Sequence, residues 1–207
     1  MKKRSQITQA AVLAVAGLSS LTAMAETATV SATVTVDNSI DFTATGTMNF
    51  GTLRAKADNT GTNCAYLTLV ANPATTTLQS TAGANTTANC GNTGGSTLQA
   101  VGGTIARPTF TIGGVAGFTT LAVTLPTEVE LTAALAPGAA SFYLRDFTAY
   151  KTSGTPGAVT STIQVDGTGA ATFVLGATLA TDGEASTSGY EDSIPYSGDI
   201  EVEVAYQ

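Results

Sequence analysis

The sequence contains no histidine, so it lacks the side chain that enzymes use most often as a general base. Ser-His-Asp and Cys-His nucleophile systems are therefore impossible, and two cysteines alone do not complete a zinc site. There is also no G-x-S-x-G nucleophile elbow and no G-x-x-x-x-G-K-S/T phosphate loop. These absences predict a protein that is not an enzyme and that holds no cofactor or metal ion.

Long apolar runs are also absent, and the one short run lies near the start of the chain. Basic residues at positions 2–4 precede the apolar residues 10–21, and Ala-Met-Ala at 23–25 forms an A-x-A site. The run is too short to span a bilayer, and no later segment has 18 uninterrupted apolar residues. We predict a signal peptide over residues 1–25, cleavage before Glu26 and export of residues 26–207 as a single domain, without membrane insertion after cleavage.

Charged residues make up only 11% of the chain, and the formal net charge is −7. Removal of Lys2, Lys3 and Arg4 with the signal peptide leaves five basic residues against 15 acidic ones, a formal net charge of −10. Nucleic acids and anionic membranes are bound by clustered Lys and Arg. The composition therefore argues against both as partners.

The chain has only two cysteines, Cys64 and Cys90. In an exported protein the default state of such a pair is a disulfide. Closing a loop of about 27 residues would stabilise the fold by roughly 3 to 4 kcal/mol in the chain-entropy model. Residues 71–97, much of which the bridge would enclose, are rich in Ala, Asn, Thr and Gly and need that help. We predict a Cys64–Cys90 disulfide.

Residues 197–207 have the clearest strand pattern. Two sets of side chains alternate there: Ile200, Val202, Val204 and Tyr206 against Asp199, Glu201, Glu203 and Ala205. A period of two places each set on its own face of a strand. We therefore predict a core strand in which the apolar set is buried.

A second alternating segment, residues 28–36, follows the predicted cleavage site, with Ala28, Val30, Ala32, Val34 and Val36 on one face. Nine extended residues would cover roughly 30 Å, enough to line a sheet edge. Two hypotheses stay open. The strand pairs within its own chain, or it is a donor strand that completes the sandwich of a neighbour through Val30, Val34 and Val36, as in chaperone-usher pilus subunits. In the second case the partners are copies of the protein or other pilus subunits, and a periplasmic chaperone.

Other short strands are predicted along the rest of the chain, separated by turn residues. They cover residues 48–53, 65–70, 110–112, 121–125, 142–149, 163–165 and 173–175. A change of phase predicts a β-bulge near Arg145 and Asp146, and Asp166-Gly167 predicts a hairpin between the last two strands. Residues 128–135 come closest to helical spacing. About eight to ten strands predict an all-β fold, an Ig-like or pilin-like antiparallel β-sandwich.

Four motifs carry a family resemblance. They are Met48-Asn49-Phe50-Gly51, the stretch from Phe110 to Gly117 before Leu125-Pro126, Gly176-Ala177-Thr178-Leu179, and Tyr196-Ser197-Gly198 leading to Val202. In this order, over residues 28–207, the chain resembles the bacterial family called domain of unknown function forty-four hundred two. The resemblance implies a secreted Ig-like or pilin-like protein, often of Gram-negative bacteria, with no catalytic residues to carry over.

Paired carboxylates are the remaining catalytic possibility, because sugar hydrolysis uses two of them. Glu128 with Glu130, and Glu201 with Glu203, are such pairs. They alternate with apolar neighbours such as Val129 and Val202, which is typical of an ordinary solvated strand face. We therefore favour a structural interpretation of both pairs.

Residues 182–199 contain the two candidate binding groups. Hard oxygen ligands for calcium could come from Asp182, Glu184, Glu191, Asp192 and Asp199, although their spacing matches no known calcium loop. Tyr190 and Tyr196 could form a platform for a sugar, but aromatic residues are only 6% of the chain, and a packing role is favoured.

Together these patterns predict a non-catalytic, exported structural or adhesive protein of the Gram-negative cell envelope, located in the periplasm, at the cell surface or outside the cell. A pilus subunit that assembles by donor-strand exchange is one form of this prediction. A self-complemented monomeric binding module, for example for glycans, is the alternative.

Overall fold

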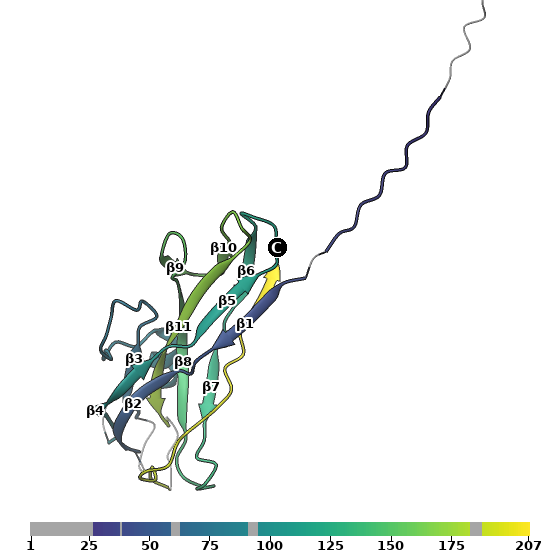
Figure 1. Cartoon of the computed structure of the whole chain (residues 1–207). Coiled ribbons are helices and arrows are strands. Elements are labelled where there is room, and N and C mark those ends of the chain that lie inside the picture. Colours follow the sequence, from purple (N-terminus) through teal and green to yellow (C-terminus); the bar gives the residue numbers. More distant parts are fainter. Residues whose placement is uncertain (1–26, 38, 59–62, 91–94, 183–187) are drawn as a thin grey trace, which may run out of the picture. The chain divides into compact units, whose positions relative to one another are not determined.

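The computed structural model describes residues 27–37, 39–58, 63–90, 95–182 and 188–207. It divides the chain into two units, Met1–Val36 and Asp37–Gln207. In the first unit only residues 27–36 are described, and they belong to no helix or strand. The predicted signal peptide lies outside the described residues. The second unit is an all-β sandwich of antiparallel strands, which confirms the predicted fold class (Figure 1).

The larger sheet is built around the long central strand β11 (Ala171–Thr181). Its strands follow the order β1 (Asp41–Thr45), β5 (Thr109–Gly113), β11, β8 (Phe142–Lys151) and β7 (Glu128–Leu131). Beyond β5, the far half of β11 pairs with β3 (Tyr66–Leu69), and β9 (Gly157–Val159) pairs with β8. Every residue of β11 except Thr172 is buried, so this strand forms the centre of the sandwich.

Gly176 in the middle of β11 allows β3 to approach closely. A Cβ atom at this position would lie 2.2 Å from the carbonyl oxygen of Leu69 and 2.4 Å from the backbone nitrogen of Ala71. No side chain fits between these backbones, which is a recurrent reason for glycine inside a strand.

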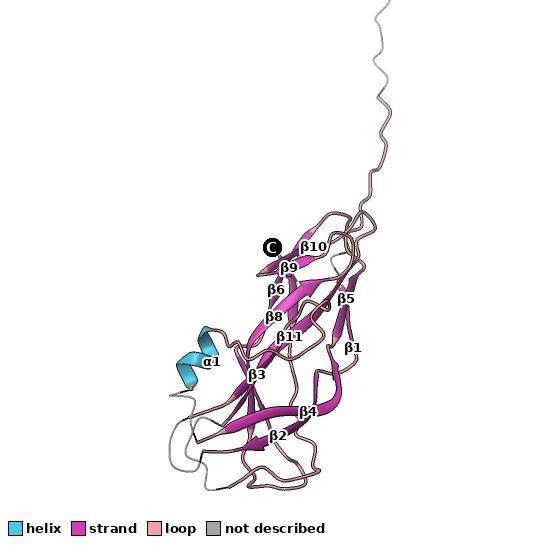
Figure 2. Cartoon of the chain, turned by 90° about the vertical axis from the view of Figure 1, so that its left-hand side faces the viewer, coloured by secondary structure: helices cyan, strands magenta, loops and turns pink. Residues whose placement is uncertain are grey.

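The second layer is a three-stranded sheet with the order β10 (Thr162–Gln164), β6 (Thr120–Thr124) and β12 (Glu203–Tyr206). A separate two-stranded sheet pairs β2 (Asn49–Lys56) with β4 (Thr97–Ala106). The short helix α1 (Ala84–Asn89) follows β3 in the chain (Figure 2). The described residues therefore contain twelve strands, against the eight to ten predicted for the chain.

The two larger apolar clusters among the described residues fill the sandwich. The first lies between the large sheet and the three-stranded sheet and includes Phe110, Phe173, Leu121 and Ile163. The second contains Phe50, Leu69, Phe142, Leu144, Ala177 and Leu179, and Leu98 and Ile105 of β4 pack against it. Buried residues alternate along β5 and β6, as expected for strands with one face in a sandwich core.

The predicted β-bulge is confirmed in β8. Arg145 pairs with Thr178 and Thr148 pairs with Gly176, so two residues of β8 stand opposite Ala177. Asp146, inside the bulge, has φ +48°, in the left-handed region that aspartate tolerates better than most residues. The bulge changes which face the following side chains occupy, which is the phase change visible in the sequence.

Two local predictions differ from the structure. The Asp166-Gly167 hairpin is wrong, because β10 pairs with β6 whereas β11 pairs with β5, β8 and β3. The turn is present, with the Asp166 amide donating to the Ala170 carbonyl at 2.9 Å, but it carries the chain from one sheet to the other. Residues 128–131, which lie in the stretch closest to helical spacing, form strand β7, and the helix lies at residues 84–89 instead.

Candidate functional site

The connection between β9 and β10 determines which sheet edges lie on the same side of the sandwich. β9 belongs to the large sheet and β10 to the three-stranded sheet, and only Thr160 and Ser161 separate them. The β10 end of the small sheet therefore lies over the β8 and β9 side of the large one. It follows that β12, at the other end, lies toward the side where β1 is the edge strand (Figure 1).

The β1 edge leaves a core aromatic side chain incompletely covered. Phe42 stacks on Phe110 at 5.7 Å between ring centroids, and Phe110 stacks on Phe173 at 5.2 Å. Phe173 is 0% exposed and Phe110 5%, whereas Phe42 is only half-buried. Ala44 shares the face of Phe42 and is exposed. The first core cluster thus becomes open to solvent toward β1.

Apolar side chains are also only partly buried at β12, the edge strand of the three-stranded sheet. Val204 pairs with Val123 of β6, and Ile200, Val202 and Val204 pack half-buried against the first core cluster. The strand is shorter than predicted, because it begins at Glu203 and residues 198–202 lie in no strand. Tyr206 was predicted to be buried, but it is 41% exposed and is not among the residues packed against the cluster.

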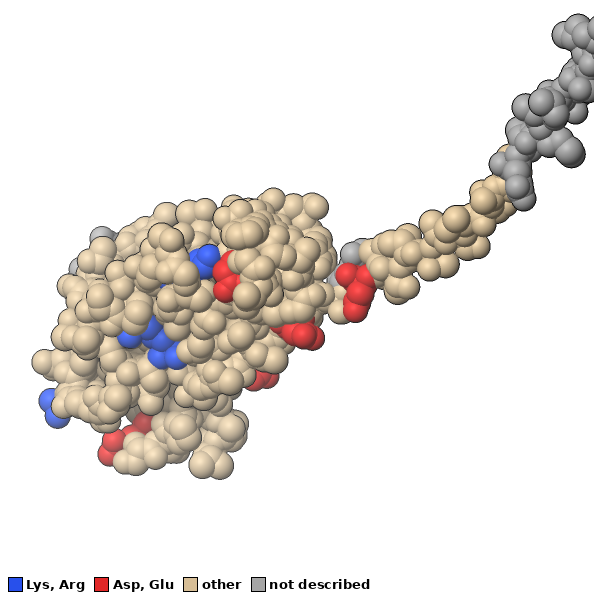
Figure 3. Space-filling model, turned by 45° about the horizontal axis from the view of Figure 1, so that its top comes forward, with Lys and Arg blue, Asp and Glu red and all other residues tan. Residues whose placement is uncertain are grey.

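The outward face of this segment is acidic. Asp199, Glu201 and Glu203 are all exposed and alternate with the half-buried apolar residues. On the face drawn in Figure 3, charged side chains are few and most of the surface is uncharged. A row of three carboxylates therefore marks the β12 edge on an otherwise weakly charged protein.

Residues 27–37, considered by themselves, form neither helix nor strand, and both hypotheses for residues 28–36 stay open. Val30, Val34 and Val36 are 88%, 87% and 73% exposed. No residue from 28 to 36 is charged. The segment retains an uncovered apolar face of the kind that a sheet would bury.

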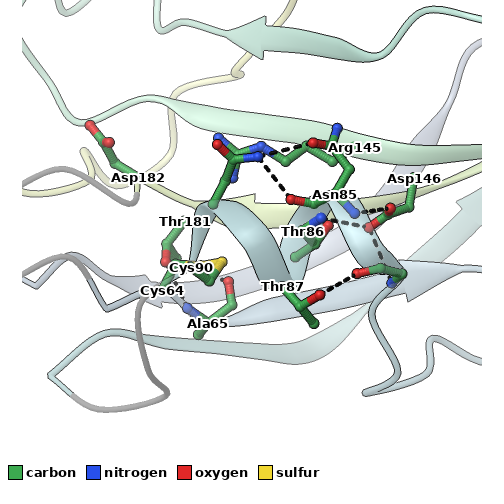
Figure 4. The surroundings of a disulfide bond; sticks show 12 residues. Cys64, Ala65, Asn85, Thr86, Thr87, Cys90, Arg145, Asp146, Thr181 and Asp182 are labelled. Carbon is green, nitrogen blue, oxygen red and sulfur yellow. Dashed lines mark hydrogen bonds between the residues drawn. A yellow bond between two sulfur atoms is a disulfide. The ribbon is translucent and has the colours of Figure 1, made fainter.

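The Cys64–Cys90 disulfide is confirmed, with a Cα–Cα distance of 5.3 Å (Figure 4). Both cysteines are buried and pack with Ala180 of β11. The Ala65 amide donates to the Thr181 hydroxyl oxygen at 2.8 Å, which fixes the start of β3 beside the end of β11. The bridge therefore fastens α1 and the segment around it to the central strand.

Asp146 in the β8 bulge caps α1 from outside the helix. Its carboxylate accepts hydrogen bonds from the backbone amides of Gly83, Asn85 and Thr86 at 3.1, 2.8 and 2.9 Å (Figure 4). Burial alone would raise the pKa of this carboxyl, but the hydrogen bonds from Thr86, Asn85 and Gly83 outweigh it and hold the pKa below its usual value. The arrangement satisfies helix amides that have no partner inside the helix.

The structure gives the first carboxylate pair structural partners. Glu128 accepts a hydrogen bond from Arg145 Nε at 2.5 Å, and Glu130 accepts one from the Ser141 hydroxyl at 2.7 Å. Arg145 is only 5% exposed and its guanidinium lies 4.8 Å from the Tyr143 ring centroid. Glu128 therefore connects β7 to β8, and Glu130 connects β7 to the residue just before β8. Glu201 and Glu203 lie on the exposed β12 face described above.

Tyr190 and Tyr196 pack on a core phenylalanine. Tyr190 stacks on Phe142 at 4.1 Å, and Tyr196 meets the same ring edge-on at 4.9 Å. The Tyr190 hydroxyl donates to the Ser141 carbonyl at 3.0 Å, and burial raises the pKa of this hydroxyl. Both tyrosines therefore pack against the second core cluster.

Among the residues that the structure describes, no group of three or more His, Cys, Asp or Glu side chains is close enough together to hold a metal ion. The calcium candidate Glu184 lies outside the described residues. Within the same described part of the chain, no helix has the length and hydropathy needed to cross a bilayer.

Sequence reasoning identified both alternating segments but did not identify the β1 edge. Residues 41–45 contain only Phe42 as a large apolar residue, so their alternating pattern is weak. In comparisons with known proteins, no family model, no curated protein and no solved structure matches the chain. The resemblance given above therefore stays a prediction.

Proposed function

We propose that the protein is a non-catalytic, exported structural subunit of the Gram-negative cell envelope that assembles by strand exchange between copies. Residues 28–36 of one copy complete the sandwich of the next, as in a pilus fibre. The observation that carries the proposal is the uncovered apolar face of this segment, with Val30 and Val34 nearly fully exposed.

The energetics favour a partner for this segment. Burying a valine side chain contributes about 1.5 to 3 kcal/mol relative to leaving it exposed. Val30, Val34 and Val36 together would add several kcal/mol, and backbone pairing along an edge would add more. An alternating strand of roughly 30 Å gains this only by lying against an open sheet edge.

The remaining features support a structural rather than a catalytic role. The chain has no histidine, and Glu128 and Glu130 already hold Arg145 and Ser141. The disulfide fits an oxidising compartment outside the cytoplasm. Copies of the protein, other subunits of the same fibre and a periplasmic chaperone that covers the segment before assembly are the partners that this function requires.

A deletion of residues 26–37 from the exported chain tests the proposal. The truncated chain should unfold at the same temperature as the full exported chain, because in strand exchange the segment completes the sandwich of a neighbour and not its own. It should also fail to form polymers, measured by sedimentation and electron microscopy of periplasmic extracts.

A self-complemented monomer behaves in the opposite way. Its sandwich would lose stability on deletion, and the full chain would stay monomeric at all concentrations without any chaperone. That result would reject strand exchange and leave the surface or periplasmic binding module as the function to pursue, beginning with glycan arrays.

A further inference from the structure

We infer that the two turns formed by residues 113–119 and 164–170 make a binding site for a neutral pyranose sugar. The sugar ring stacks on the side chain of Phe118, and its hydroxyl groups donate hydrogen bonds to Asp166. The site lies outside residues 28–36, so this inference goes beyond the proposed function and does not depend on strand exchange. A fibre and a monomer would both carry the site.

Phe118 is the large apolar side chain that these turns leave in solvent. It lies in the connection between β5 and β6, at the end of the sandwich where β6 and β11 begin (Figure 1). Its side chain is 69% exposed, whereas Val115 and Leu121 on either side of it in the chain are buried. A single exposed apolar residue is common on protein surfaces. The backbone of Phe118 is what makes this one unusual.

Phe118 has φ +61°, in the left-handed region that bulky side chains rarely adopt. A residue held in such a conformation costs free energy and persists only where the surrounding structure fixes it, and such residues gather at ligand sites. The ring contributes little burial in return, because most of it is exposed. The fold therefore maintains a strained backbone that holds an aromatic ring in solvent.

The neighbouring turn fixes both the backbone and the ring of Phe118. The Phe118 amide donates to the Asp166 carbonyl at 2.9 Å, and Gln164 Nε2 donates to the Phe118 carbonyl at 3.2 Å. The ring lies over Gly167, where an added Cβ atom would be 3.0 Å from the ring Cζ. A ring that is already held in place loses little conformational freedom when a ligand binds.

The two turns pack backbone against backbone. A Cβ atom at Gly117 would lie 2.5 Å from the Gly167 carbonyl oxygen, and one at Gly169 would lie 1.8 Å from the Val115 carbonyl oxygen. No side chain fits at either position, so glycine is required for the close approach. The turns therefore form one rigid support for the Phe118 ring.

The same turn supplies an exposed hydrogen-bond acceptor. Asp166 Oδ1 accepts hydrogen bonds from the Thr168 hydroxyl at 2.6 Å and from the amides of Thr168 and Ala170 at 2.8 and 3.1 Å. These bonds, led by the Thr168 hydroxyl, hold the pKa of Asp166 below its usual value, and nearby Lys151 lowers it further. Oδ2 accepts no hydrogen bond within the described residues. A carboxylate only accepts, so this oxygen is suited to a ligand that donates hydroxyl groups.

The chemistry of these groups fits a sugar ring. A pyranose has an apolar face of C–H groups, which an aromatic ring can cover, and a rim of hydroxyls that need acceptors. The exposed side chains of Gln164, Asp166 and Thr168 supply polar groups near the one exposed ring. A protein partner would need about 800 Å² of complementary surface with clustered apolar side chains at its centre. Among the residues of these two turns, only Ala116 joins Phe118 as an exposed apolar side chain.

Charge restricts the class of sugar. The free oxygen of Asp166 would repel the carboxylate of a sialic or uronic acid, and the exported chain has a formal net charge of −10. Neutral hexoses and N-acetylhexosamines carry no such charge. We therefore expect glycans with neutral terminal sugars to bind and acidic ones to be excluded.

A glycan array tests the site with the exported chain, residues 26–207. The immobilised oligosaccharides end in glucose, galactose, mannose, N-acetylglucosamine, sialic acid or glucuronic acid. The variants are Phe118→Tyr, which keeps a stacking ring, Phe118→Gly, which removes it, and Asp166→Asn, which removes the charge. The matched control is Leu135→Ala, because Leu135 is also exposed but precedes Phe142, the partner of Thr181 at the other end of β11.

We expect the parent chain and Leu135→Ala to bind the same neutral glycans equally. Phe118→Tyr should stay within about threefold of the parent, and Phe118→Gly should lose at least about tenfold, because the stacked ring is gone. Asp166→Asn should lose about three- to tenfold, since a charged acceptor makes the stronger hydrogen bond. Phe118→Gly should unfold at close to the parent temperature, because glycine adopts φ +61° without strain.

Three results would overturn the inference. The first is a parent chain that binds none of the neutral glycans and shows no amide shift at residues 117–119 with millimolar methyl glycosides of the same sugars. The second is unchanged glycan binding by Phe118→Gly, or binding that prefers the acidic sugars. The third is a marked loss of thermal stability in Phe118→Gly, which would mean that the ring supports the fold. Polymer formation is measured separately, so none of these results decides strand exchange.

Discussion

Residues 28–36 and residues 200–206 share one pattern of alternating side chains but lie in different environments. Val202 and Val204 are half-buried against the first core cluster. Val30 and Val34 are 88% and 87% exposed. The second segment has β6 beside it, and Val204 pairs with Val123. The first segment, considered by itself, forms no strand.

The difference shows what alternation determines. A period of two fixes which side chains share a face, whereas hydrogen bonding to a neighbour fixes whether that face is buried. A lone strand is not stable in water without a partner. In our account the partner of residues 28–36 is supplied by another copy.

The largest expected effect comes from a comparison of the central strand β11 with the edge strand β1. Phe173→Ala removes a fully buried ring from β11 and should lower the free energy of unfolding by about 3 to 5 kcal/mol. Phe42→Ala removes a half-buried ring from β1 and should cost clearly less, about 1 to 2 kcal/mol. Urea unfolding of monomeric chains measures both. Equal losses would mean that the β1 edge is already covered.

Loss of the disulfide lowers the stability of the sandwich without altering either alternating segment. Cys64→Ala with Cys90→Ala should reduce the free energy of unfolding by about 3 to 4 kcal/mol, since the unfolded chain regains a loop of about 27 residues. Below its lowered melting temperature the double variant should still polymerise. Loss of polymers from a folded double variant would show that assembly depends on overall stability rather than on strand exchange.

The same polar substitution in the two segments tests the comparison directly. Val204→Asn places an amide against the core and should destabilise the monomer by about 2 to 3 kcal/mol. Val34→Asn should leave the free energy of unfolding unchanged within about 0.5 kcal/mol, because this side chain is exposed. A matching loss at Val34 would place residues 28–36 inside their own sandwich.

The smallest expected effect concerns the Asp146 cap of α1 and its pH dependence. The depressed pKa contributes stability that is present above the ordinary aspartate value of 3.8 and is lost as pH falls through the lower pKa of the folded chain. Asp146→Asn keeps a residue that tolerates positive φ but should cost about 1 kcal/mol at neutral pH. The variant should also lose less stability than the parent chain over the acid range, measured by thermal unfolding.

The sequence predicted the elements whose buried side chains alternate without interruption. Phe110 with Ile112 and Leu121 with Val123 are examples, and each pair lies in a strand with its side chains in the core. Strand β4 was not predicted, because it contains Gly102 and Gly103 and is largely exposed. Its pairing with β2 depends on contacts between residues distant in sequence.

Helix α1 also could not be predicted from its own residues. Its six residues, Ala-Asn-Thr-Thr-Ala-Asn, present no apolar stripe, and Gly83 supplies no side-chain cap. The helix depends on Asp146 from another element and on the adjoining disulfide. The candidate site was predictable in part, since both alternating segments are visible in the sequence, but the open β1 edge follows only from the three-dimensional order of strands.

The most direct test of strand exchange is the mass of the exported chain, residues 26–207, measured by light scattering after size exclusion, beside Thr33→Asn and Val34→Asn. The account predicts concentration-dependent polymers for the parent chain and for Thr33→Asn, whose side chain faces outward, and monomers for Val34→Asn. Monomers in all three samples at every concentration would contradict it.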